Sequence, residues 1–110
     1  MTAEWIDVGA EAAVAAAETL TMEIDGRPVV IARCDEGFFA VEDCCTHDGE
    51  ALAGGEVDPE AAQIICPRHG ARFSLKTGEA LTAPAYEPVR AFKVRVENGR
   101  VLIAREGTLP

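Results

Sequence analysis

The sequence is short of basic residues and of long apolar runs. Its 110 residues contain 10 Lys and Arg against 19 Asp and Glu, which gives a formal charge of −9. A chain this acidic is repelled by nucleic acid and by anionic membranes, which argues against partners of either kind. The longest apolar runs, AAVAAA and PVVIA, are far shorter than the ~20 residues that cross a bilayer. The amino terminus lacks the basic start of a secretory signal, so we expect a cytoplasmic protein.

Histidine is also scarce, and both histidines lie close to cysteine. His47 follows Cys45 by two positions and Cys44 by three, and His69 follows Cys66 by three. Cysteine in an intracellular chain indicates metal binding or chemistry more often than a disulfide, and adjacent cysteines do not readily bridge each other. Two cysteine-histidine pairs therefore predict a metal site.

Two metals suit two cysteines and two histidines. Zinc takes four such ligands tetrahedrally, whereas a [2Fe–2S] cluster can place two thiolates on one iron and two imidazoles on the other. In an extended loop, Cys45 and His47 point to the same side and reach one cluster, but the spacing from Cys44 to His47 also suits zinc. The glycine-rich loops that hold the pairs favour iron without deciding between the two metals.

The remaining sequence predicts short antiparallel strands. The alanine-rich residues 9–18 predict a short helix or a turn. Alternating apolar segments flank Asp25-Gly26 and Asn98-Gly99, pairs typical of tight hairpins. Further strands are expected in PVVIARC, FFAVED and QIIC. This spacing predicts one all-β domain over residues 1–110, a sandwich or small barrel with both cysteine-histidine pairs in loops at strand ends.

The two clusters resemble the Rieske pattern C-x-H…C-x-x-H. Cys45-Thr46-His47 gives the first half and CPRHG, residues 66–70, gives the second. ICPRHGARFSLKTGEAL is similar to the second loop of that family, and TAPAYEPVRAFKVRVENGRVLI to its cover loop and last hairpin. The resemblance extends over roughly residues 28–104. It implies a Rieske-like antiparallel β-sandwich with a cluster-binding subdomain of two loops, at about 43–55 and 66–74.

The resemblance also implies the ligands and the function. One [2Fe–2S] cluster per chain would have Cys45 and Cys66 on one iron and His47 and His69 on the other, which leaves Cys44 as a neighbour. The chain is similar to the soluble ferredoxins of bacterial aromatic-ring dioxygenases. Such a protein is not an enzyme: it carries single electrons from a flavin-dependent reductase to a terminal oxygenase. The sequence has no further histidine for the mononuclear iron of an oxygenase.

Departures from other Rieske proteins predict a low reduction potential. Glu50 and Arg68 stand where respiratory Rieske proteins have two bridging cysteines, and Ala71 and Phe73 replace a serine and a tyrosine whose hydroxyls donate toward the cluster. Fewer donors on an acidic chain favour the oxidised state. Backbone N–H groups around Gly49 and Gly70 are expected to donate to the sulfurs.

Two other functions fit the same residues. The chain could be the small Rieske-like subunit of an assimilatory nitrite reductase, although such subunits often lack the ligands that are present here. It could also be a structural zinc-binding domain.

Several other side chains carry simpler expectations. Asp48 and Glu50 could recognise a basic patch on a reductase, and Arg68 and Arg72 could contribute to docking. Tyr86 could shield the cluster. The residues expected in the core are Trp5, Cys34, Phe38, Phe39 and Phe92, with Cys44 packed beneath its loop.

Overall fold

Short antiparallel strands form almost all of the regular structure. The computed structural model describes residues 5–17, 19–44, 51–52, 54–67, 70–83 and 87–104. The elements are β1 (Trp5–Ala10), α1 (Glu11–Ala17), β2 (Thr19–Ile24), β3 (Arg27–Cys34), β4 (Gly37–Glu42), β5 (Val57–Asp58), β6 (Gln63–Ile65), β7 (Arg72–Ser74), β8 (Ala91–Phe92), β9 (Val94–Glu97) and β10 (Arg100–Ala104).

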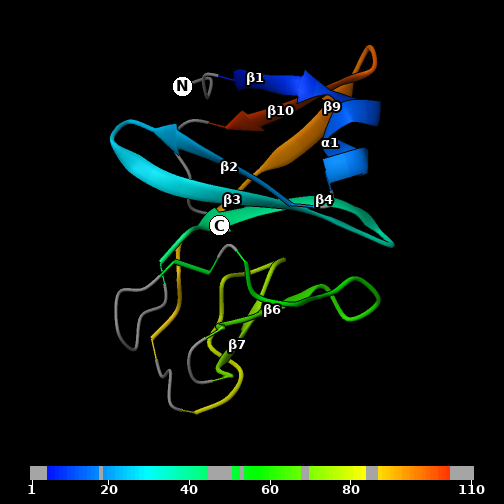
Figure 1. Ribbon diagram of the computed structural model, residues 1–110. Coiled ribbons are helices and arrows are strands. Elements are labelled where there is room, and N and C mark those ends of the chain that lie inside the picture. The colour runs from blue at the N-terminus through cyan, green and yellow to red at the C-terminus, as the bar shows by residue number, and fades with distance from the viewer. Residues whose placement is uncertain are drawn as a thin grey trace.

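The strands form three sheets arranged in layers (Figure 1). A sheet of order β1-β10-β9 lies on one side, a sheet of order β2-β3-β4-β8 lies in the middle, and a small sheet of order β5-β6-β7 lies on the other side. The chain passes from the middle sheet to the first at Lys93, between β8 and β9. The predicted all-β antiparallel architecture is confirmed.

Strand β3 explains how the layers are held together. Successive side chains of a strand point to opposite faces, and here both faces are buried. Val29 and Ile31 pack into the core toward β10, whereas Val30 and Ala32 pack into a second core that includes residues of β6 and β7. The uninterrupted apolar run VVIA is therefore the signature of a strand between two cores.

Both predicted hairpins are confirmed. Asp25-Gly26 joins β2 to β3, and Asn98-Gly99 joins β9 to β10. All four residues have positive φ, between 52° and 80°, as the tight turns that match strand twist require. The expected strands at PVVIARC, FFAVED and QIIC also form. Strands β1, β5 and β7 were not predicted, because β5 and β7 have only two and three residues and β1 has no turn signal before it.

The alanine-rich segment forms a helix, as the sequence allowed. Helix α1 packs Val14 into the core between the first and middle sheets. No helix within the described ranges is long and apolar enough to cross a membrane.

The prediction that all the named aromatic residues lie in the core is wrong in part. Phe92 and Cys34 are buried as expected. Phe38 and Phe39 are half-buried but pack against the two cores, whereas Trp5 is half-buried and is not among the described residues of either core. These three line an open groove of about 300 Å³ together with Lys76, Phe92, Lys93 and Val94. Trp5 lies at the start of the outer sheet, where the guanidinium of Arg95 covers its ring at 4.4 Å.

Candidate metal centre

The second cysteine-histidine loop leaves β6 at Cys66, whose side chain is 1% exposed. The Cys66 N–H donates to the Ala71 carbonyl at 2.7 Å, and the Gly70 N–H donates to the Cys66 carbonyl at 3.0 Å. Gly70 has a φ of +74°, which a side chain would strain. These two bonds close a tight turn between β6 and β7 that contains position 69. The turn fixes Cys66 at its start.

The first loop begins just after β4. The Asp43 N–H donates to the Pro28 carbonyl at 2.8 Å, and the Cys44 N–H donates to the Glu42 carbonyl at 2.9 Å. The Asp43 carboxylate is buried, and its Oδ1 accepts the Leu52 N–H at 2.6 Å. Positions 45 and 47 lie in the segment between Asp43 and Leu52, so both ends of that segment are tied to the middle sheet.

The two loops share one core. Leu52 is fully buried in the cluster that contains Cys66, Ala71 and Phe73. Beyond Leu52, the backbone at Gly55 approaches β6 so closely that an added Cβ would lie 1.9 Å from the Ile65 carbonyl oxygen. The Ile65 N–H in turn donates to the Glu56 carbonyl at 2.9 Å. The loop that contains positions 45 and 47 therefore returns to the fold directly beside the strand that ends at Cys66.

A further segment follows the second loop. The Leu81 N–H donates to the Arg72 carbonyl at 2.8 Å, and the Arg72 N–H donates to Thr82 Oγ1 at 2.9 Å. Leu81 itself is one of the exposed large apolar side chains, at 39%. This segment leads into the expected cover loop and is fastened to the first residue of β7.

The structure describes one of the four expected ligands. Cys66 is placed as above, while Cys45, His47 and His69 lie outside the described residues. Among the described residues alone, no group of three or more candidate ligands comes together. The part of the site that is described fits a cluster: a cysteine sulfur is held in an apolar environment at the start of one loop, and the other loop is anchored against the same core. Thiolate and imidazole are the ligand types for both zinc and [2Fe–2S].

The other cysteines have different environments. Cys34 lies at the far end of β3 from Asp43, pairing with Gly37. Burial, with Asp35 and Asp58 nearby, raises the pKa of its thiol, which keeps it a neutral core residue. Cys44 is half-buried rather than fully packed under the loop.

One expected hydrogen-bond donor has another partner. Backbone N–H groups around Gly70 are expected to donate toward a cluster sulfur, but the N–H of Gly70 itself donates to the Cys66 carbonyl and closes the turn. Gly49 lies outside the described residues, as do the sites of the other expectations at Asp48, Glu50, Arg68 and Tyr86. Arg72 is half-buried, and its Nη1 donates to Gln63 Oε1 at 3.2 Å, so part of its donor capacity is used within the small sheet.

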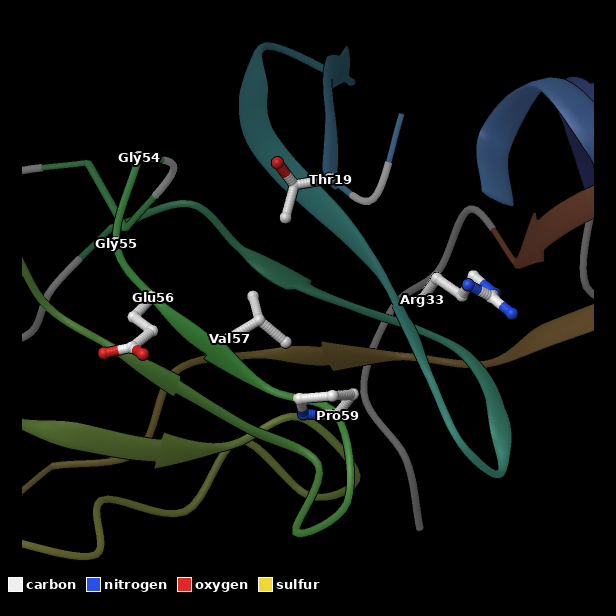
Figure 2. A pocket seen from close by; sticks show the side chains of 7 residues that line it. All are labelled: Thr19, Arg33, Gly54, Gly55, Glu56, Val57 and Pro59. Carbon is white, nitrogen blue, oxygen red and sulfur yellow. The ribbon is translucent and has the colours of Figure 1, made fainter. Parts of the chain in front are cut away.

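A larger groove has a lining that does not include Cys66. It measures about 490 Å³ and is lined by Thr19, Arg33, Gly54, Gly55, Glu56, Val57 and Pro59. Figure 2 shows the charged groups of Glu56 and Arg33 at opposite ends and directed away from each other. A ligand site needs polar groups that converge on one point, so this groove is not a candidate site.

Sequence reasoning missed Asp43, Leu52 and Gly55. Each looks ordinary in the sequence: an acidic residue after a strand, an isolated leucine, and the second of two loop glycines. The one feature of the sequence that could have drawn attention to Asp43 is that it directly precedes the two cysteines.

Known proteins of the same kind match almost the whole chain. The model of the Rieske [2Fe-2S] domain family matches residues 4–93. The ferredoxin component of the naphthalene 1,2-dioxygenase system of Pseudomonas putida is 30% identical over 94% of this chain and 97% of its own length. The 3-phenylpropionate/cinnamic acid dioxygenase ferredoxin subunit of Escherichia coli K12 is 36% identical over 74% of this chain and 77% of its own.

A solved structure agrees with these relatives. A chain in the complex of reduced oxygenase and oxidized ferredoxin in carbazole 1,9a-dioxygenase superposes with a TM-score of 0.87 and 31% identity, covering 99% of this chain and 100% of that one. This chain therefore belongs to the Rieske [2Fe–2S] domain family, whose cofactor is a [2Fe–2S] cluster.

Proposed function

We propose that this protein is a soluble electron-transfer ferredoxin, formed by a single domain over residues 1–110, that serves a terminal oxygenase in the cytoplasm. The observation that carries the proposal is the match over 94% of this chain and 97% of the relative to a protein named as a dioxygenase ferredoxin component, together with a second such relative matched over 74% of this chain. The likeness to a chain in an oxygenase–ferredoxin complex supports the oxygenase as the electron acceptor. A flavin-dependent reductase is the proposed donor.

The proposed ligands are Cys45 and Cys66 on one iron and His47 and His69 on the other. The cluster supplies a site that accepts and releases one electron, with no substrate chemistry of its own. Two thiolates, two sulfides and two ferric ions sum to zero charge, so imidazole ligands make reduction easier than four thiolates would. The chain provides a buried Cys66 and two anchored loops, which exclude water from one sulfur and keep the ligands in place.

The described residues support a low potential within this family. Ala71 and Phe73 are fully buried beside Cys66 and have no hydroxyl to donate. The buried Asp43 carboxylate adds negative charge near the first loop. Both features stabilise the oxidised state relative to a Rieske centre with more donors.

The test is spectroscopic and then functional. The purified protein should contain two irons and two labile sulfides per chain, have visible absorption bands, and give a rhombic EPR signal after reduction by dithionite. It should then be reduced by a flavin-dependent reductase with NADH and reoxidised by a terminal oxygenase of a related dioxygenase system. A colourless, zinc-containing protein would refute the electron-transfer function, and a coloured protein that no such oxygenase reoxidises would refute the proposed acceptor.

A further inference from the structure

Asp43 is unusual because it is a buried acid. Among the described residues it is the only charged side chain that is buried, at 8% exposure. A carboxylate is kept out of water only where hydrogen bonds replace its hydration. One replacement is the short bond of 2.6 Å from the Leu52 N–H to Asp43 Oδ1. A bond to a charged acceptor is roughly twice as strong as one between neutral groups.

The backbone of Asp43 is fixed independently of that bond. Its N–H donates to the Pro28 carbonyl at 2.8 Å, and the preceding Glu42 N–H donates to the Arg90 carbonyl at 2.8 Å. Asp43 therefore lies just after β4, an inner strand of the middle sheet, with β3 on one side and the approach to β8 on the other. A side chain held in this way can position whatever binds to its carboxylate.

Leu52 connects the carboxylate to the second loop. Its side chain is fully buried in the core that contains Cys66, and its carbonyl accepts the Gly55 N–H at 3.0 Å. Gly55 lies against the backbone of Ile65, the residue before Cys66. A continuous path of contacts thus runs from Asp43 through Leu52 and Gly55 to the strand that presents Cys66.

We propose that Asp43 is a positioning residue that clamps the first cluster-binding loop and sets its place relative to the second. This proposal rests on the proposed function, since it assigns Cys45 and His47 to the loop that the clamp closes. Glu50 and Arg68 occupy the positions where respiratory Rieske proteins bridge their loops with cysteines. Here the carboxylate–amide bond and the Leu52 contact tie the first loop to the core of the second. The same charge holds the reduction potential down.

Asp58 provides a matched control. Its Oδ1 also accepts a backbone N–H, from Ala61 at 3.1 Å, but this bond is exposed and lies at the turn between β5 and β6. The variants are Asp43→Ala, Asp43→Asn, Asp58→Ala and Asp58→Asn in the full-length holoprotein. Three quantities are measured: the rate at which visible absorption is lost in excess chelator, the midpoint potential, and hydrogen exchange at the Leu52 amide.

Asp43→Ala should release the cluster about tenfold faster or more, the factor expected for losing a bond to a charged acceptor. Asp43→Asn keeps an oxygen for Leu52, so it should release the cluster less rapidly than Asp43→Ala while its potential rises above wild type. Exchange at the Leu52 amide should accelerate in both variants, more in Asp43→Ala. Both Asp58 variants should match wild type in all three quantities.

Equal release rates for Asp43→Ala and Asp58→Ala would overturn the clamp. If Asp43→Ala does not fold, Asp43→Asn decides: unchanged Leu52 exchange and an unchanged potential would overturn the proposal. The proposed function fails by a different result, namely wild-type protein without iron and labile sulfide. If wild-type protein holds its cluster but the Asp43 variants behave like the Asp58 variants, the clamp proposal is refuted and the proposed function stands.

Discussion

Replacing Gly55 with alanine tests whether the close contact between the two loops holds the site together. The φ of Gly55 is not in the left-handed region, so alanine can adopt its backbone conformation. The added Cβ would, however, lie 1.9 Å from the Ile65 carbonyl oxygen and 3.0 Å from that of Leu52. The contact with Ile65 must open by about 1.1 Å to reach even 3.0 Å. The effect of this substitution is therefore purely steric.

The backbone that must move is firmly held. Ile65 belongs to β6, which pairs with β5 on one side and β7 on the other, and its N–H donates to the Glu56 carbonyl. Overpacking against such a backbone costs typically about 1–3 kcal/mol of unfolding free energy. In a domain of this size that corresponds to a fall in melting temperature of roughly 5–20 °C. Because Cys66 directly follows Ile65, we also expect the Gly55→Ala protein to retain less iron per chain.

Gly54→Ala is the matched control. Gly54 has a φ of +93° and nothing within 4 Å of an added Cβ, so alanine there costs about 1–2 kcal/mol through backbone strain alone. Thermal unfolding followed by circular dichroism, with iron content per chain, compares the two variants. Gly54→Ala should lose stability and keep its iron. If Gly55→Ala keeps both the melting temperature and the iron of wild type, or if both variants lose iron equally, the reasoning about the loop contact is wrong.

Three further predictions test the site and the fold. Cys45→Ser should purify without visible bands while Cys44→Ser keeps them, and loss of iron from Cys44→Ser instead would show that the ligand assignment is wrong. The Arg100 guanidinium beside Asp7, with Nε to Oδ2 at 2.9 Å, holds the pKa of that carboxyl below its usual range. This pair therefore stabilises the fold above about pH 4, and its contribution is lost as the pH falls through the lowered pKa. The melting temperature of Asp7→Asn should fall less steeply with acid than that of wild type, by a small, salt-sensitive amount because the pair is exposed, and identical pH profiles would contradict this. Phe73→Tyr should raise the midpoint potential measured by voltammetry if its hydroxyl donates toward the sulfurs, and an unchanged potential would show that the missing hydroxyl is not a cause of the low potential.

The sequence predicted the fold well where local chemistry decides it. Asp25-Gly26 and Asn98-Gly99 favour positive φ and so determine their hairpins without tertiary information. The strand expected at PVVIARC forms, and the structure adds that its VVIA run is buried on both faces. Trp5 was assigned to the core because large aromatic residues are mostly buried. Trp5 is half-buried, with Arg95 over its ring, and this environment depends on how the strands assemble.

The site was predictable only as a set of residue types. Cysteine and histidine are rare enough that two pairs at family spacing predict a ligand set, but the residues that hold the loops are common ones. Asp43 differs from an exposed aspartate only because β3 and Leu52 surround it. The sequence does not reveal that the Gly70 N–H donates to the Cys66 carbonyl, because this bond depends on how the turn folds. Sequence patterns report which groups are present, whereas their partners depend on contacts between distant segments.

The two cores have different roles in the structure. This division explains how a short chain can support a site whose proposed ligands need fixed positions. The core between the first and middle sheets contains Val29, Ile31 and Val101 and includes neither Leu52 nor Cys66. The opposite core contains Cys66 and Leu52, so the apolar contacts of these two residues also hold the two loops. Because β3 contributes alternate residues to both, the loop-bearing core is built on a strand that the other core already holds. Rigid support behind the ligands keeps them in one geometry, which is what a binding site of defined properties requires.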